Sequence, residues 1–200
     1  MLSVADCFAS AAPYYDEHAQ LQRWAGRHLL DKALPAAQWL DIGSGTGYLS
    51  RHLPSQQVLG LDLAMAMLRQ AHSHARVQAD MHALPLQNGS MDAIAANLSL
   101  QWSRQPVQVL TEAARVCRPQ GQLLFTVPAA DTFPELQSAI ATQQLAVNVF
   151  PTDAQWQQWL HQSGWQGVRC QCLEQPLYFA DPKALLLHFK ATGASSAPRT

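Results

Sequence analysis

A glycine-rich turn between a predicted strand and a predicted helix constrains this chain more than any other feature. The apolar run at 38–42 leads into Gly43, Gly45 and Gly47, spaced Gly-x-Gly-x-Gly. Glycine adopts positive φ values without steric cost, and without a Cβ it lets a ligand lie directly against the backbone. The spacing differs from the Gly-x-Gly-x-x-Gly of turns that bind a pyrophosphate. We therefore expect a tight strand-to-helix loop that faces a ligand.

Apolar strands alternate with helical patterns along the first two thirds of the chain. The predicted strands are residues 38–42, 58–61, 76–79, 93–97 and 122–127. The predicted helices are residues 16–34, 48–53, 65–71 and 106–118. Strands that are almost wholly apolar are typical of a parallel sheet buried on both faces. The pattern predicts an α/β, Rossmann-like fold with helices on both faces of a mostly parallel sheet.

The last third of the chain has a looser pattern. We expect a helix over 134–147 and a second helix that begins with a capping box at Thr152 and Gln155 and ends at Gly164. Residues 168–179 read as a strand interrupted at Pro176, and Asp181 begins a final helix. We find no repeat and no linker, so the chain is predicted to form a single domain.

Composition limits the classes of partner. Nearly half of the 200 residues (48%) are hydrophobic, which is enough for a full core, and the net charge of −1 provides no basic field for nucleic acid. No apolar run reaches membrane-spanning length, and the N-terminus lacks the features of a secretory signal. We expect a cytoplasmic protein with free cysteines, no metal site, and neither nucleic acid nor membrane as a partner.

Polar side chains follow three of the predicted strands at their carboxyl ends, where open parallel sheets bind ligands. Asp62 stands at the offset from the glycine loop that suits an acid bound to a ribose diol, although it could instead cap the next helix. Asp80 and Asn97 end the next two strands, and Asp80 could simply belong to a surface turn. Asp41, directly before the loop, is expected to orient it or to meet an ammonium group.

Two of these motifs resemble those of class I methyltransferases that use S-adenosylmethionine (SAM). They are the glycine loop and the Asp-x-x-x-Leu-Pro stretch at 80–85. The resemblance implies SAM as cofactor and S-adenosylhomocysteine as product, with the acid of the second motif bound to the adenine amino group. The cofactor-binding residues that it implies are Asp41, Gly43, Ser44, Gly45, Gly47, Asp62, Leu63, Asp80, Met81, Asn97 and Leu98.

More selective segments resemble one family, the malonyl-acyl carrier protein O-methyltransferases of biotin synthesis. They are residues 8–19, 97–102, 125–126 with 134–136, and 188–194. The resemblance implies methylation of the free carboxylate of malonyl-acyl carrier protein or malonyl-CoA. Family members continue into a final antiparallel strand, so we expect that strand to be missing here, with an exposed sheet edge.

The same resemblance implies that three segments of the chain have different roles. Residues 1–35 would form a helical lid over the substrate, 36–130 the SAM-binding core, and 131–200 the substrate-side helices and a C-terminal strand. The candidate donors to the malonyl carboxylate are Tyr14, Tyr15, His18, Trp102 and Lys190. Without the resemblance, each of the aromatic residues would be interpreted as ordinary packing.

An acidic carrier protein needs a local basic surface. Arg23 and Arg27, one helical turn apart, and Lys32 are predicted to supply it, although such a spacing also fits a solvated helix face. Two other functions stay open: methylation of another small acid or a quinone precursor, and SAM binding without catalysis. A nicotinamide dehydrogenase fits least, because the glycine spacing differs and no catalytic His or Tyr–Lys set is evident.

Overall fold

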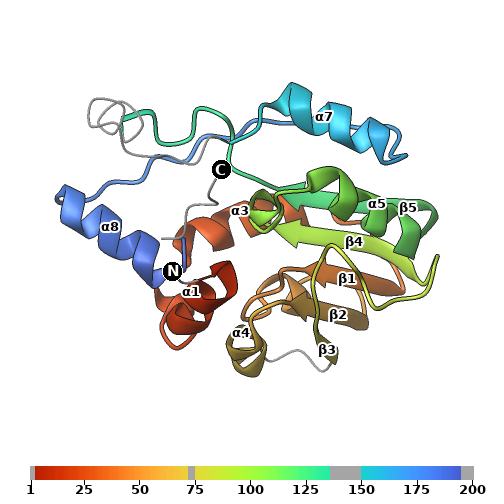
Figure 1. The fold of residues 1–200 in the computed structure, drawn as a ribbon, viewed down its shortest axis with the longest axis horizontal. Coiled ribbons are helices and arrows are strands. Elements are labelled where there is room, and N and C mark those ends of the chain that lie inside the picture. Colours follow the sequence, from red (N-terminus) through yellow and green to blue (C-terminus); the bar gives the residue numbers. More distant parts are fainter. Residues whose placement is uncertain (1–2, 72–74, 136–149, 195–200) are drawn as a thin grey trace.

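Five parallel strands form one sheet in the order β3-β2-β1-β4-β5 (Figure 1). The computed structural model describes residues 3–71, 75–135 and 150–194. The strands are β1 (Gln38–Ile42), β2 (Gln57–Asp62), β3 (Ala75–Gln78), β4 (Met91–Asn97) and β5 (Cys117–Thr126). The strand order reverses between β1 and β4, which is the position at which such sheets bind ligands. The predicted Rossmann-like parallel sheet is confirmed.

Helices cover both faces of this sheet. They are α1 (Val4–Ala11), α2 (Tyr15–His18), α3 (Gln20–Leu30), α4 (Met65–Gln70), α5 (Pro106–Val116), α7 (Asp153–Gln162) and α8 (Pro182–Ala191), with 3₁₀ turns η1 (Leu49–Arg51) and η2 (Leu100–Trp102). The helix α5 packs against β5 and α7, whereas α3 packs against β4 and β5 from the other side (Figure 1). Among the described residues, no helix is long and apolar enough to span a membrane.

Side chains of the central strands alternate between two cores. Leu40 and Ile94 pack with Leu110 of α5 on one face, and Trp39 packs with Leu29 of α3 on the other. All five side chains are 4% exposed or less. The period of two along each strand therefore explains why an almost continuous apolar run is needed: both faces are buried.

The N-terminal third differs from the prediction in its helices. The predicted helix over 16–34 is two helices, α2 and α3, separated at Ala19, whose ψ of 41° is not helical. The helix expected after the glycine loop is only the single turn η1, because few residues stand between Gly47 and Pro54. The helix α1 was not predicted, although its capping box is visible in sequence: Ser3 and Asp6 exchange hydrogen bonds.

The C-terminal third is partly as predicted. Thr152 and Gln155 form the expected capping box of α7, and the Asp181 side chain caps α8. The predicted strand over 168–179 is wrong: the segment is irregular and mostly exposed. It buries no apolar face, and Pro176 has no N–H to donate. Among the described strands, β5 therefore pairs on one side only, with β4.

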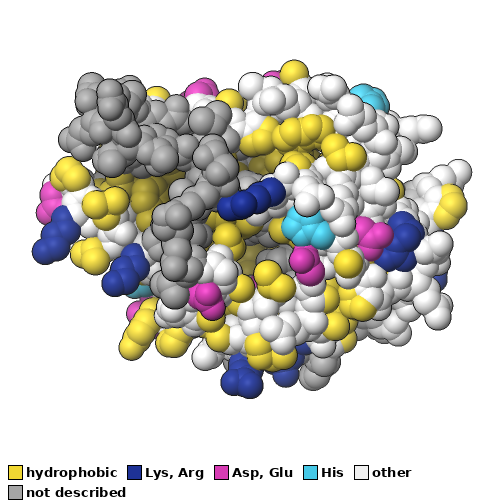
Figure 2. Space-filling model, in the orientation of Figure 1, with side chains coloured by type: hydrophobic (Ala, Val, Ile, Leu, Met, Phe, Trp, Pro, Cys, Tyr) yellow, Lys and Arg dark blue, Asp and Glu magenta, His cyan; other side chains and the backbone are white. Residues whose placement is uncertain are grey.

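The helix α8 lies away from the sheet, at the left of Figure 1, and contacts α1 and α2. Its Leu186 and Leu187 are 61% and 55% exposed, and hydrophobic side chains are visible there in Figure 2. The predicted helix over 134–147 lies almost wholly outside the described residues. The four cysteines are free thiols, as expected.

Candidate functional site

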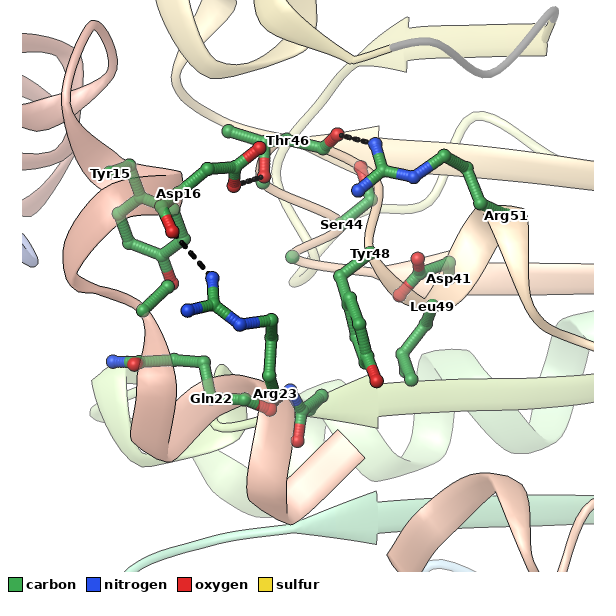
Figure 3. Close-up of a pocket in the computed structure, with 14 residues that line it drawn as sticks. Tyr15, Asp16, Gln22, Arg23, Asp41, Ser44, Thr46, Tyr48, Leu49 and Arg51 are labelled. Carbon is green, nitrogen blue, oxygen red and sulfur yellow. Dashed lines mark hydrogen bonds between the residues drawn. The ribbon is translucent and has the colours of Figure 1, made fainter. Parts of the chain in front are cut away.

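A cavity lies where the glycine loop after β1 faces α2 and α3 (Figure 3). Its volume is about 120 Å³, which is smaller than the roughly 300–1,000 Å³ of a pocket that encloses a whole small molecule. The cavity can therefore hold one end of a larger ligand. Its lining residues are Tyr15, Asp16, Ala19, Gln22, Arg23, Asp41, Gly43, Ser44, Gly45, Thr46, Tyr48, Leu49, Arg51 and Asn97.

The glycine loop has the backbone that its sequence predicts. Gly43, Gly45 and Gly47 have φ values of 69°, 55° and 83°. The N–H groups of Gly43 and Ser44 both donate to the carbonyl oxygen of Leu61, at 2.7 and 2.9 Å, and so attach the loop to β2. A Cβ at Gly43 would lie 2.4 Å from the Cβ of Ser99, so only glycine fits there.

Asp41 is the buried carboxyl of the site. It is 1% exposed, lines the cavity, and accepts a hydrogen bond of 2.7 Å from the Ser50 hydroxyl. Burial raises its pKa to about 7, although the Ser50 hydrogen bond opposes that shift. Because this pKa lies near neutral pH, a cation placed beside Asp41 would shift its carboxyl group toward the charged form.

Asp62, at the end of β2, binds and stabilises the glycine loop. Its carboxylate accepts from the backbone N–H of Gly45 at 2.9 Å and from that of Ala64 at 2.8 Å. Burial raises the pKa of Asp62, and the backbone donors act in the opposite direction. The alternative of a helix cap does not hold, because the residue at the N-cap position of α4 is Ala64.

Asp80 follows β3 and is bound within its own turn. One carboxylate oxygen lies 2.6 Å from His82 Nδ1 and 2.9 Å from the His82 backbone nitrogen, and these contacts lower the pKa of Asp80. The other ring nitrogen of His82 lies 2.8 Å from the Ser103 hydroxyl. Asp80 is half exposed, so its second oxygen remains accessible to a ligand.

A clamp from α5 holds the segment after Asp80. Glu112 accepts from the Leu84 N–H at 2.8 Å, while Arg115 donates to the carbonyl oxygens of Leu84 and Leu86 and pairs with Glu112. Sequence reasoning missed this clamp. The only available signal was the spacing of Glu112 and Arg115, which places them on one helix face.

Asn97 joins three elements behind the cavity. Its amide nitrogen donates to the carbonyl oxygen of Gln22 at 2.8 Å, and its oxygen accepts from the Thr126 hydroxyl at 2.7 Å. The next residue, Leu98, has a φ of 48°. Of the two residues predicted at the end of β4, Asn97 lines the cavity, whereas Leu98 does not and occupies a strained turn between β4 and η2.

The N-terminal segment closes one side of the cavity through contacts that were not predicted. The Thr46 hydroxyl donates to the Asp16 carboxylate at 2.6 Å, and Arg51 donates to the Thr46 carbonyl oxygen at 2.9 Å. Arg23 donates to the carbonyl oxygen of Asp16 (Figure 3). The side chain of Arg23 is half-buried and lines the cavity, a position that favours contact with a bound ligand over the predicted docking surface.

The five residues predicted to contact the substrate do not all lie at the cavity. Tyr15 lines the cavity, where burial and the nearby Asp62 and Asp16 raise its pKa. Trp102 is half-buried, and its indole nitrogen has no hydrogen-bond partner among the described residues. The other three predicted donors, Tyr14, His18 and Lys190, are exposed and do not line the cavity. In the described part of the chain there is no group of three metal-ligating side chains.

Comparisons with known proteins identify the class. Residues 40–125 match the family model of the methyltransferase domain. A SAM-dependent methyltransferase from Thermotoga maritima, described as a possible histamine N-methyltransferase, has a TM-score of 0.67 at 17% identity and 80% coverage of each chain. The SAM complex of phosphoethanolamine N-methyltransferase 2 from Haemonchus contortus has a TM-score of 0.63 at 16% identity, over 82% of this chain and 44% of that one.

Curated relatives are more similar in sequence. Malonyl-[acyl-carrier protein] O-methyltransferase from Alcanivorax borkumensis is 36% identical, over 96% of this chain and 70% of the relative. The protein of the same name from Methylococcus capsulatus is 34% identical, over 96% of this chain and 76% of the relative. The bifunctional biotin biosynthesis protein BioHC from Cellvibrio japonicus is 36% identical, over 96% of this chain and 40% of that protein.

The fold and the glycine-loop site, together with these matches, define the chain as a SAM-dependent methyltransferase of class I, with SAM as its cofactor. The residues present fit that cofactor: two residues that line the cavity, Gln22 and Ser44, each have a buried side-chain oxygen with no partner among the described residues. Within this class, the chain belongs to the malonyl-[acyl-carrier protein] O-methyltransferase family.

The buried carboxyl predicts a pH dependence of stability. The pKa of Asp41 is 3.8 in its ordinary state and about 7 in the fold, so its contribution to stability is complete below pH 4 and is lost as the pH rises to 7. Asp41→Asn keeps an acceptor for Ser50 but does not titrate. We expect the free energy of unfolding in urea to fall less between pH 5 and pH 7.5 in the variant than in the wild type. An equal fall in both proteins would contradict the shifted pKa.

Proposed function

We propose that this enzyme methylates the free carboxylate of a malonyl group on acyl carrier protein and so forms the methyl ester. The observation that carries this proposal is family membership over nearly the whole chain, combined with a SAM-type glycine-loop site. The ester removes the charge of the terminal carboxylate, so the product resembles an ordinary acyl chain. That chemistry fits a first step of pimeloyl formation in biotin synthesis, the pathway named for the relative from Cellvibrio japonicus.

The reaction needs little proton transfer. A malonyl carboxylate is ionised at neutral pH, so its oxygen is already a nucleophile and no general base is required. SAM supplies the methyl group as an electrophile on a sulfonium. The chain must then hold the carboxylate oxygen in line with that group and exclude water from the anion.

The proposed cofactor contacts follow the order of the strands. The carboxyl ends of β1, β2 and β3 lie side by side. They present the glycine loop with Asp41, then Asp62, then Asp80. We assign the loop to the amino-acid end of SAM, Asp62 and Leu63 to the ribose, and Asp80 and Met81 to the adenine. Asn97 and Leu98 complete the site at the end of β4.

The proposed acyl site lies under residues 1–35, which act as a lid. Trp102 supports this proposal, because its buried indole N–H has no hydrogen-bond partner among the described residues and could donate to an anion. Phe8 of α1 packs edge-on against Trp102, with 5.5 Å between the ring centroids. Tyr15 is the second proposed donor. Tyr14, His18 and Lys190 are assigned to the entrance, since α2 and α8 are in contact and all three are exposed.

The proposed carrier-docking surface is reduced to Arg27 and Lys32. Both are exposed, on α3 and directly after it. Charges at the edge of an interface mainly change association rate and salt dependence. They would attract an acidic carrier protein without any contact to the malonyl group.

The first experiment is intact mass spectrometry of malonyl-acyl carrier protein incubated with this enzyme and SAM. We expect the carrier to gain the mass of one methyl group, whereas acetyl-acyl carrier protein, which has no free carboxylate, gains none. Methylation of both carriers, or of neither, would contradict the proposed acceptor. S-adenosylhomocysteine retained on an inactive preparation would point to a different acceptor.

Asp62→Ala should weaken SAM binding by about 100-fold or more, because two charge-assisted hydrogen bonds to the ribose are lost. Asp62→Asn keeps one acceptor and should be intermediate. The measurement is calorimetric titration with S-adenosylhomocysteine, with thermal unfolding of each variant as the control for folding. Affinity close to that of the wild type in Asp62→Ala would remove this residue from the cofactor site.

The double variant Arg27→Glu, Lys32→Glu should raise the KM for malonyl-acyl carrier protein by about tenfold at low salt and leave the KM for malonyl-CoA unchanged. The matched control is Arg69→Glu on α4, which is also exposed. An equal change with both substrates, or the same change in the control, would exclude the docking surface.

A further inference from the structure

The cavity at the glycine loop contains a cation, Arg23, that has no anionic partner in the part of the chain that the structure describes. Arg23 extends from α3 into the space bordered by Tyr15 and Tyr48 (Figure 3). Its guanidinium donates to a neutral group, the carbonyl oxygen of Asp16. Within the described ranges, no carboxylate lies within ion-pair distance of it. A half-buried guanidinium with spare N–H donors fits an anion that arrives with a ligand.

The same cavity contains acceptors without donors. Gln22 Oε1, from the residue before Arg23, and Ser44 Oγ, from the glycine loop, are buried and make no hydrogen bond within the described residues. Buried polar atoms are almost always bonded, so unpaired ones on residues that line a cavity indicate a ligand with polar groups. Asp41, which lines the same cavity, adds a carboxyl that a nearby cation would favour in its charged form.

We propose that Arg23 binds the carboxylate of the amino-acid end of the cofactor and that Gln22 Oε1 accepts from its ammonium group. A free amino acid end carries these two opposite charges, and two adjacent residues at the start of α3 match them. The small cavity volume suits this end of the molecule alone. The inference rests on SAM as cofactor and is independent of the malonyl substrate.

The other cationic side chains near the cavity are less suited than Arg23 to bind the cofactor carboxylate. Arg51 also lines it, but its side chain is exposed and donates to the Thr46 carbonyl oxygen within its own loop. Arg27 lies one turn along α3 from Arg23, is exposed, and does not line the cavity. Arg27 is therefore a matched control: the same side chain on the same helix, outside the site.

The test compares two ligands that differ only in the amino-acid end. S-adenosylhomocysteine carries it, whereas 5′-deoxy-5′-methylthioadenosine keeps the adenosine and the thioether and lacks it. Calorimetric titration of Arg23→Gln should show at least about tenfold weaker binding of S-adenosylhomocysteine. Binding of methylthioadenosine should change less than about twofold. Arg27→Gln should bind both ligands as the wild type does, and Arg23→Lys should recover part of the loss.

Three results would overturn the proposal. The first is undiminished binding of S-adenosylhomocysteine by Arg23→Gln, and the second is an equal loss for both ligands. The third is an equal loss in Arg27→Gln. None of these results involves the acyl acceptor, so failure of this proposal is distinct from failure of the malonyl reaction. Gln22→Leu gives a second readout, with the same selective loss for the ligand that carries the ammonium.

Discussion

The site depends on the carbonyl oxygen of Leu61, which holds the glycine loop in place by hydrogen bonds. This oxygen accepts the N–H groups of two successive loop residues, Gly43 and Ser44, so the end of β2 fixes the turn that leaves β1. Asp62, the next residue, then binds the Gly45 N–H. Three loop amides are thereby held by one strand end, so contacts within the protein itself fix the shape of the loop. Such preorganisation lowers the entropy that binding must otherwise remove.

The fold was predictable because its signals are local and repeated. Each apolar run near 38–42, 57–62 and 91–97 is a strand buried on both faces, and the glycine spacing has the positive φ values that it implied. Long-range contacts were not predictable: nothing in sequence indicates that Thr46 meets Asp16, or that Arg23 enters the cavity. The predicted strand over 168–179 failed because alternation of residue types does not supply a buried face.

The electrostatics of the site show why its charged residues are hard to assign from sequence. Asp41, Asp62 and Asp80 are the same residue type at the ends of neighbouring strands, yet burial raises the pKa of the first two and hydrogen bonds from His82 lower that of the third. The difference depends on burial and on backbone donors, which only the fold defines. A motif can therefore place a carboxyl group without defining its protonation.

The hydrogen bond between Thr46 and Asp16 has a thermodynamic consequence. It joins the glycine loop, which belongs to the cofactor site, to the N-terminal segment, which covers the proposed acyl site. If ordering of one border favours ordering of the other, the two binding events share a coupling free energy, and that coupling must be reciprocal. If bound cofactor increases the affinity for the acyl group by some factor, the bound acyl group increases the affinity for the cofactor by the same factor. Dissociation of one product, S-adenosylhomocysteine or the methyl ester, then lowers the affinity for the other.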